Sequence, residues 1–254
     1  MGSLFAMMQF SGVWDRWRTG LRELVGRERA EYYSPDFAHP YAGLMAIVHR
    51  ATLTPSKMEL LEQWLPNQQW FRGTGPVNLV RVGSFRFDDP DGEVGIETLL
   101  VANEGAVFQV PVTYRGSPLP GGGPCLVGMM EHSFLGTRWI YDAAVDPVYA
   151  SALAASILTG QPQADQYFEV DGTMELVPES VHLQSTGTPN ARVPVIGSAV
   201  PDTTGEVTTI HAENLEMSVR RALNLVGSPP GLRTLTATWD QQTTPVQLAS
   251  LIRT

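Results

Sequence analysis

The basic residues of this sequence limit the chemistry that it can perform. The 254-residue chain has 17 basic residues, of which sixteen are arginines and one is a lysine, Lys57. Phosphate-transferring enzymes use a lysine for the nucleotide phosphates, a catalytic-loop Asp followed by an Asn, and a metal-binding Asp. None of the five histidines opens a His-x-Asp triplet, and arginine is a poor substitute for the phosphate lysine. The sequence therefore predicts that the chain is not a competent kinase.

A carboxylate pair and an acid beside an imidazole are the other candidates for chemistry. Asp142 and Asp146 are four residues apart, and Glu131 directly precedes His132. Either pair could serve acid–base catalysis or contribute to a metal site. We favour structural roles, with Asp146 as a helix N-cap and with Asp142 ending a strand or pairing with Arg138.

Metal and hydrolase sites have less support. The single cysteine, Cys125, and the scattered histidines lack zinc-ligand spacing. Ser133 follows His132 but has no nucleophile-elbow context. We interpret Cys125 as a small buried apolar side chain, and a lone thiol fits a reducing compartment. The sequence therefore gives us no catalytic residue, no metal ligand and no cofactor.

The first element that must position side chains is a predicted helix. We expect Thr54 to be its N-cap and Pro55 to occupy its first position. Apolar residues recur at helical spacing on one face, at Met58, Leu60, Leu61, Trp64 and Leu65. Pro66 should end the helix, because its ring cannot continue the hydrogen-bond ladder. The loop that follows carries two aromatic rings and a cation, Trp70, Phe71 and Arg72.

Short β-like segments separated by turn residues follow this loop. Strands are predicted at residues 77–87, 94–102, 106–114, 126–130 and 137–141. A second helix should begin with Asp146 as N-cap and Pro147 at its first position, and end at Gly160. The expected arrangement is one helix laid across an antiparallel meander whose strands are taken in sequence.

Beyond a polar boundary at residues 161–171, the sequence again predicts β structure. Strands are expected at residues 174–177, 181–184, 193–196, 206–211, 215–220 and 232–239. Residues 213–225 would equally fit a helix, because Leu215, Val219 and Leu223 repeat every four positions.

Residues 1–44 differ from the rest of the sequence. Trp14, Trp17 and Leu21 fall on one helical stripe among nearly balanced charges. This pattern fits an amphipathic helix that docks on the body of the protein, with a partner or a membrane surface as alternatives. A further alternative is a non-native extension before a natural start at Met45.

Composition excludes several classes of protein. With 43% hydrophobic and 17% charged residues, the chain is too apolar for disorder. Its net charge of -9 argues against binding nucleic acid. No window reaches the roughly 18 to 20 apolar residues that a membrane span needs, and charged residues interrupt the N-terminal segment too early for a secretory signal. We therefore expect a cytoplasmic protein without a transmembrane segment.

Two blocks of sequence resemble a known family. The pattern Leu-x-x-Trp-Leu-Pro-x-Gln-x-Trp-Phe-x-Gly at residues 61–73 resembles the opening of the N-terminal cap domain of actinobacterial maltokinases, including those fused to trehalose synthase. Residues 110–115 and 138–149 resemble the later strands and closing helix of that cap. The resemblance implies an α+β fold in which an antiparallel sheet wraps one main helix, as in cystatins, followed by a second, mostly β segment.

The resemblance also implies a domain organisation. We expect an N-terminal extension at residues 1–44, a cap-like domain at 45–165 and a β-rich segment at 172–254. In maltokinases the small kinase lobe follows the cap, so the β-rich segment is either a remnant of that lobe or an unrelated sheet. The sequence ends at Thr254, before a helical large lobe could be built. We interpret the chain as a free-standing cap homologue without a kinase core.

The two blocks that carry the resemblance also hold the candidate recognition residues, which are Trp70, Phe71, Arg72, Arg115, Arg138, Trp139 and Asp142. Aromatic rings can stack on sugars or anchor a protein partner, although they would also fill the core between helix and sheet. We expect a non-catalytic binding or regulatory module that acts on a protein partner in trehalose, maltose or α-glucan metabolism. The alternative is a sugar-active enzyme or carbohydrate binder with a pocket between the cap and the C-terminal sheet.

Overall fold

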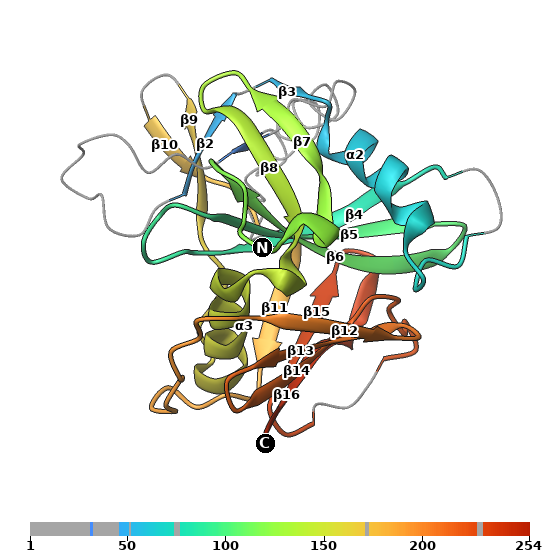
Figure 1. The fold of residues 1–254 in the computed structure, drawn as a ribbon, viewed down its shortest axis with the longest axis vertical. Coiled ribbons are helices and arrows are strands. Elements are labelled where there is room, and N and C mark those ends of the chain that lie inside the picture. The colour runs from blue at the N-terminus through green and yellow to red at the C-terminus, as the bar shows by residue number, and fades with distance from the viewer. Residues whose placement is uncertain (1–30, 33–45, 51, 74–76, 171–172, 228–230) are drawn as a thin grey trace, which may run out of the picture.

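The computed structural model describes residues 31–32, 46–50, 52–73, 77–170, 173–227 and 231–254 (Figure 1). The stripe of Trp14 and Trp17 lies outside these residues, so the amphipathic helix stays a prediction. Among the described helices, none has the length and apolar character that crossing a membrane requires.

The first sheet has six antiparallel strands in the order β3-β7-β8-β6-β5-β4. They are β3 (Leu53–Thr54), β4 (Val80–Phe87), β5 (Gly95–Asn103), β6 (Ala106–Arg115), β7 (Leu126–His132) and β8 (Gly136–Asp142). The five strands predicted between residues 77 and 141 are confirmed. We expected the strands to follow one another in sequence order, and this was wrong. The loop of residues 116–125 places β7 away from β6, and β8 then lies between these two strands.

Helix α2 (Lys57–Trp64) begins later than the sequence predicted. Its N-cap is Ser56, whose hydroxyl accepts from the Glu59 N–H at 3.2 Å, while the Glu59 carboxylate accepts from the Ser56 N–H at 2.7 Å. This reciprocal capping box satisfies two donors at once, which Thr54 could not do. Thr54 belongs to β3 instead, so its assignment as N-cap was wrong. Pro66 falls in a 3-10 turn, η1 (Leu65–Asn67), that follows the helix as expected.

The predicted apolar face of α2 packs on one face of the first sheet. Leu60, Leu61 and Leu65 are buried there, and Met58 and Trp64 are partly buried beside them. Alternate residues of the strands complete this core, including Leu99, Val101, Phe108, Val110, Val112 and Ile140.

The opposite face of the first sheet is covered by helix α3 and a second sheet (Figure 1). Helix α3 (Pro147–Thr159) has Asp146 as N-cap and ends at Gly160, whose φ of 75° suits a glycine. Both of these predictions are confirmed. A short 3-10 turn, η3 (Ala143–Val145), joins β8 to this helix, and another, η2 (Gly123–Cys125), precedes β7.

The second sheet is also antiparallel, in the order β11-β15-β16-β14-β13-β12. Its strands are β11 (Val181–Ser185), β12 (Val200–Thr204), β13 (Val207–Ala212), β14 (Leu215–Arg220), β15 (Thr234–Trp239) and β16 (Gln242–Arg253). Residues 215–220 form a strand, so the helical alternative for residues 213–225 was wrong. The strand predicted at residues 193–196 is also wrong, because this segment is irregular.

A third, smaller sheet brings distant parts of the chain together. It contains β1 (Glu31–Tyr32), β2 (Ala46–Arg50), β9 (Gln166–Val170) and β10 (Thr173–Leu176). Strands β2 and β9 pair in parallel, whereas the other pairs are antiparallel. Strand β9 therefore occupies part of the segment 161–171 that we expected to be a polar boundary.

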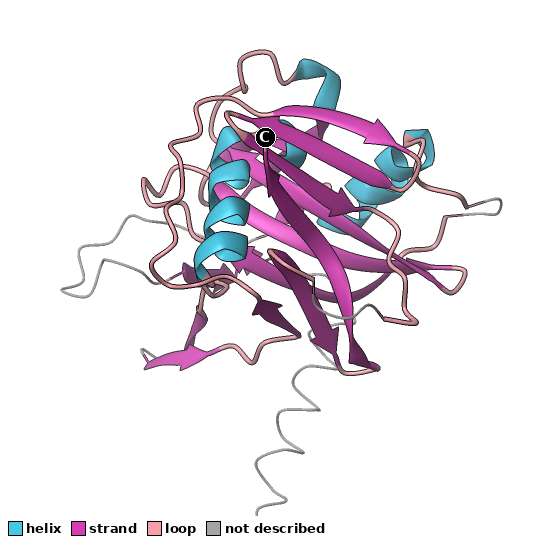
Figure 2. Ribbon diagram, turned by 90° about the horizontal axis from the view of Figure 1, so that it is seen from below, coloured by secondary structure: helices cyan, strands magenta, loops and turns pink. Residues whose placement is uncertain are grey.

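Most of the described chain is antiparallel β-sheet with few helices (Figure 2). The larger core cluster joins side chains of β4, β5 and β6 to α3 and to five strands of the second sheet. Strands β4, β5 and β6 are thus buried on both faces, by α2 on one and by α3 with the second sheet on the other. We expected one sheet that wraps a single helix, as in cystatins. That description fits only α2 and the face of the first sheet on which it packs.

Candidate recognition site

The predicted recognition residues fall into two places. Trp70, Phe71, Arg72 and Asp142 lie where the first sheet meets the second, a region that we call the sheet junction. Arg115, Arg138 and Trp139 lie at the ends of β6 and β8, which pair there. The two groups have different surroundings and are described in turn.

The rings at the sheet junction are buried. Trp70 is 2% exposed and Phe71 is 8% exposed. The ring centroids of Trp70 and Trp64 are 5.9 Å apart in an edge-on arrangement, and those of Phe71 and Phe108 are 4.9 Å apart. Neither ring therefore offers a surface to a ligand in this structure. Both rings fill the core, which is the alternative role that we considered.

Arg221 organises the sheet junction, and our sequence reasoning did not identify it. Its side chain is 1% exposed. Its Nη2 donates to both carboxylate oxygens of Asp142 at 2.8 Å, and its Nε donates to the Thr208 hydroxyl at 2.8 Å. The guanidinium carbon lies 5.3 Å from the centroid of the Trp70 ring. Asp142 does end β8 as expected, but its partner is Arg221 and not Arg138.

Backbone contacts extend this junction along β6. The Gln109 N–H donates to the Arg221 carbonyl and the Leu223 N–H donates to the Val107 carbonyl, both at 2.8 Å. From the loop after α2, the Gln69 amide donates to the Thr203 carbonyl at 2.9 Å. The sequence alone could not show that the Arg221 side chain is buried and paired, because an arginine just after a strand is ordinarily exposed.

Arg72 contributes little to the junction. Its Nε lies 3.7 Å from a carboxylate oxygen of Glu206, and its side chain is 70% exposed. Solvent screens an exposed ion pair of this length, so its contribution to stability is small.

The second group begins with an ion pair between Arg115 and Asp146. The Nε and Nη2 of Arg115 donate to the two carboxylate oxygens of Asp146, each at 2.7 Å. The hydrogen bond to Asp146 raises the pKa of Arg115 above its usual value. Asp146 is fully buried and also accepts from the Val148 N–H at 3.0 Å. Asp142 and Asp146 are therefore held by different arginines, in the structural roles that we favoured.

Beside this pair lies a row of cross-strand neighbours that we call the β7–β8 surface, formed by Met129, Trp139 and Arg115. Trp139 pairs with Met129 on β7 and with Arg115 on β6. Met129 is 45% exposed and Trp139 is half-buried. The neighbouring residues Met130 and Ile140 point to the α2 core instead, as strand alternation requires.

Arg138 lies at the same end of β8 but on the other face of the sheet, because it pairs with Met130 on β7 and alternates with Trp139. A Cβ atom on Gly116 would come within 2.6 Å of the Arg138 Nη1, so the guanidinium lies directly against that glycine. The structure therefore brings Arg115 and Trp139 together on one face of β6 and β8, whereas Arg138 lies at the same end on the other face. Asp142 and the buried rings of Trp70 and Phe71 lie at the sheet junction.

A buried charge cluster lies between α2 and the first sheet. The Lys57 Nζ donates to the Glu97 carboxylate at 2.7 Å, and the Tyr114 hydroxyl donates to the same oxygen at 2.8 Å. An Arg86 nitrogen lies 3.4 Å from it. Burial lowers the pKa of Lys57 to about 8 despite the attraction of Glu97. Burial alone would raise the pKa of Glu97, but Lys57 and Arg86 outweigh it and hold that pKa well below its usual range.

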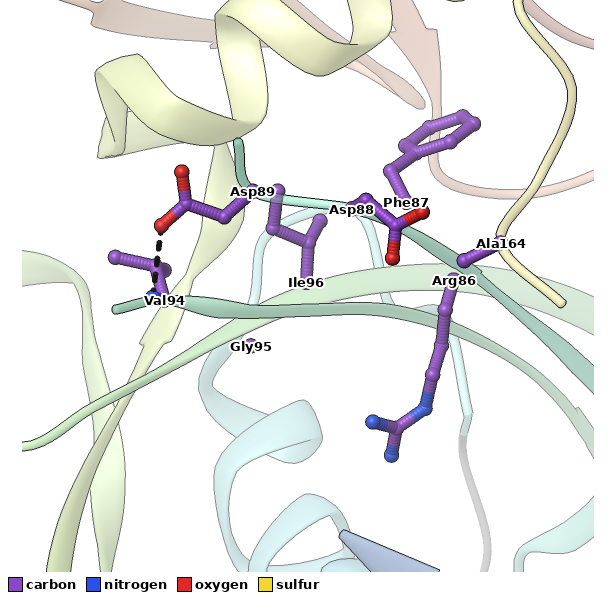
Figure 3. A pocket seen from close by; sticks show the side chains of 8 residues that line it. All are labelled: Arg86, Phe87, Asp88, Asp89, Val94, Gly95, Ile96 and Ala164. Atoms are coloured by element: carbon purple, nitrogen blue, oxygen red, sulfur yellow. Dashed lines mark hydrogen bonds between the residues drawn. The ribbon is translucent and has the colours of Figure 1, made fainter. Parts of the chain in front are cut away.

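Two small, partly open hollows are among those that the described residues form. One lies beside Asp88 and Asp89 and has a volume of about 10 Å³, which is room for about one water molecule. Figure 3 shows the Arg86 side chain turned away from both carboxylates. Burial, followed by the repulsion of Asp165, raises the pKa of Asp88. The other hollow, near the end of α3, has a volume of about 130 Å³.

Neither hollow resembles a sugar-binding cleft, because typical small-molecule sites measure roughly 300 to 1,000 Å³. Within the described ranges, no three His, Cys, Asp or Glu side chains are grouped closely enough to hold a metal ion. Cys125 is half-buried, and burial raises its pKa above the usual value.

Comparison with known proteins adds one finding. A family model described as the maltokinase N-terminal cap domain matches residues 64–146. A search among curated proteins found no match. The matched segment runs from the last residue of α2 to the N-cap of α3. The part of this chain that is similar to the maltokinase cap is therefore the first sheet from β4 to β8, and it includes the β7–β8 surface.

Proposed function

We propose that this chain is a non-catalytic binding or regulatory module, related to the cap of maltokinases, that acts on an enzyme of trehalose, maltose or α-glucan metabolism in the cytoplasm. The observation that carries the proposal is the β7–β8 surface. It places a half-buried tryptophan beside an exposed methionine within the segment that matches the cap.

The composition of this surface favours a protein partner. Tryptophan, methionine and arginine are enriched at protein interfaces, and tryptophan and arginine dominate their binding energy. Met129 and Trp139 lie side by side on neighbouring strands, and Arg115 is held in place by its two bonds to Asp146. A rigid arginine loses little conformational entropy on binding. The two hollows described above lie elsewhere and are small for a disaccharide.

The arrangement of charged groups supports a non-catalytic role. The carboxylates of Asp142, Asp146 and Glu97 are each held by a buried or half-buried basic side chain. The described strands from β11 to β16 follow one another without an intervening helix, and residues 172–254 contain no lysine. A kinase small lobe uses a lysine paired with a glutamate on a helix. These features favour an unrelated sheet over a working kinase lobe for this segment.

Affinity capture from the native host tests the proposal. The bait is the full chain, compared with Met129→Glu and with Val195→Glu as a matched control. Val195 is 92% exposed and lies outside the β7–β8 surface. We expect an enzyme of α-glucan, maltose or trehalose metabolism with the wild type and the control, and its loss with Met129→Glu. Repeated capture of no such enzyme would count against the proposal.

A thermal-shift screen separates this proposal from the alternative of a sugar-active enzyme. The ligands are Mg-ATP, maltose, trehalose and a short α-glucan. A ligand at one hundred times its Kd adds about 2.7 kcal/mol to the stability of the folded state, which is a shift of a few degrees. We expect no shift with any of the four. A shift with a sugar would favour the alternative, and a shift with Mg-ATP would contradict our interpretation of the single lysine.

A further inference from the structure

The β7–β8 surface continues along its hairpin to an exposed phenylalanine in the turn. Strand alternation places Met129 and Glu131 on the same face of β7, and the Glu131 carboxylate accepts from the Thr137 hydroxyl at 2.7 Å. Phe134, in the turn, is 68% exposed. The turn points away from the second sheet, so that sheet does not cover it (Figure 1). At roughly 3.4 Å per residue, the distance along the hairpin from Met129 to Phe134 is about 17 Å.

The chain before β1 joins the fold beside this hairpin. Glu31 of β1 pairs with Arg50 of β2, two residues before Thr52. The backbones of Thr52 and Ser133 meet there, since the Ser133 N–H donates to the Thr52 carbonyl at 3.1 Å. The segment of residues 1–30 is therefore attached close to the turn between β7 and β8.

The sequence of this segment carries an apolar stripe of matching length. In a helix, Trp14, Trp17, Leu21 and Val25 fall on one face. A helix of residues 14–25 is about 18 Å long. It would therefore cover the hairpin from its turn to the exposed methionine.

The connection between the stripe and β1 is long enough for this contact. Residues 26–30 separate Val25 from Glu31. When extended, this connection spans at most about 20 Å. The stripe can thus reach the β7–β8 surface while it stays close to its point of attachment.

The charges of the two parts are complementary. Residues 1–30 contain five arginines and three acidic residues, a formal charge of +2, and the whole chain carries -9, which leaves -11 on residues 31–254. Glu131 is exposed on the hairpin, and its described partner is an uncharged hydroxyl. Arg18 lies directly beside the apolar stripe on a helical projection. A docked helix would bring this arginine to the carboxylate.

We propose that residues 14–25 form an amphipathic helix that docks on the β7–β8 surface of the same chain. Its apolar stripe packs on Met129 and Trp139, and Arg18 pairs with Glu131. The helix then covers the surface to which we assign the partner enzyme, so the enzyme must displace it. This competition rests on the function proposed above, whereas the docking does not.

A spin label measures the docking in the full chain. Cys125→Ser removes the single native thiol, and Thr19→Cys places a nitroxide on the side of the helix opposite the stripe. We expect the label to broaden the methyl NMR signal of Met129. The signal of Met217, in the core with the second sheet, should change much less. Reduction of the nitroxide should restore the Met129 signal.

Two substitutions at neighbouring positions test the stripe in the labelled chain. Trp17→Gln should restore the Met129 signal, because it removes an apolar ring from the contact. Arg16→Gln is the matched control, since Arg16 projects from the opposite side of the helix, and it should leave the broadening unchanged. Equal broadening in the two variants, or a Met129 signal that the label never broadens, would overturn the proposal. Broadening that arises only from a label on another chain would show that a second copy is the occupant, and would also overturn it.

The competition is measured separately, with the enzyme captured in the experiment above. We expect Trp17→Gln to bind this enzyme about tenfold more tightly than the wild type, because its surface no longer has to be uncovered first. Unchanged affinity would overturn the competition. If no enzyme is captured, the function proposed above fails, but the NMR measurement still decides whether the helix docks.

Discussion

Arg221 couples three parts of the chain that are far apart in sequence. It bonds Asp142 at the end of β8 and Thr208 on β13, and it lies over the Trp70 ring. In a site this enclosed, the arginine and the aspartate depend on each other. The loss of one partner leaves the other as a buried charge without compensation.

We predict that Arg221→Met destabilises the protein by about 3 to 5 kcal/mol, because Asp142 then loses its ion pair. The free energy of unfolding in urea measures this. Arg220→Met is the control, since Arg220 is exposed on the neighbouring position and should change stability by less than about 0.5 kcal/mol. Equal effects of the two substitutions would mean that Arg221 has no special role.

Glu97 gives stability a dependence on pH. Its folded pKa lies below the unfolded value of 4.5. Its contribution is therefore complete above that unfolded value and is lost as the pH falls towards the folded pKa. Glu97→Gln should lower stability at neutral pH by about 3 to 5 kcal/mol, because Lys57 and Arg86 lose their carboxylate.

Urea unfolding across the acid range checks this prediction. The wild type should lose stability from about pH 5 downwards, and the curve of Glu97→Gln should be flatter over the same range. Parallel curves for the two proteins would contradict the assignment of this acid loss to Glu97.

At the scale of single elements, substitutions can test which residue is the N-cap of α2. Ser56→Ala removes the hydroxyl that accepts from the Glu59 N–H and should cost about 1 kcal/mol. Thr54→Ala should cost little, because Thr54 is exposed on β3 and does not cap the helix. Thermal unfolding of both variants measures the two losses of stability. A larger loss for Thr54→Ala than for Ser56→Ala would indicate that Thr54 is the N-cap, as the sequence alone suggested.

Elements with a strong local pattern could be predicted from the sequence. The apolar face of α2, the strands β4 to β8 and both ends of α3 follow from spacing, turn residues and caps. Strand β12 could not, because Pro201 and Asp202 are typical of a turn, yet they are tolerated here on an edge strand. Strand β16 begins with polar residues and was missed for a similar reason.

The candidate site was less predictable than the fold. We predicted both Trp70 and Trp139 as recognition residues from the sequence, because both lie in the blocks that resemble the cap. Only the second sheet distinguishes them, since it brings Arg221 over Trp70 and leaves Trp139 half-buried. Contacts between residues this far apart have no local signal. For the same reason, the role of Arg221 could not be identified from spacing.

Across the whole molecule, the two large sheets share one core. Leu100 of β5, Leu153 of α3 and Met217 of β14 belong to the same buried cluster. We predict that the described sheets unfold in a single cooperative transition, because neither can lose its partner without exposing this core. Native-state hydrogen exchange should give β5 and β14 the same free energy of opening. A second sheet that opens at a much lower free energy would contradict this prediction.

The most direct test of the proposed function is a binding titration with purified enzymes of trehalose, maltose and α-glucan metabolism from the native host. Each is titrated against the wild type, Trp139→Ala and the control Val195→Glu, after thermal unfolding has shown that all three are folded. We predict that at least one enzyme binds the wild type and the control equally, and binds Trp139→Ala at least about thirtyfold more weakly, as the loss of a central interface residue would cause. If no enzyme binds, or if Trp139→Ala binds as tightly as the wild type, the β7–β8 surface is not a recognition site for these enzymes.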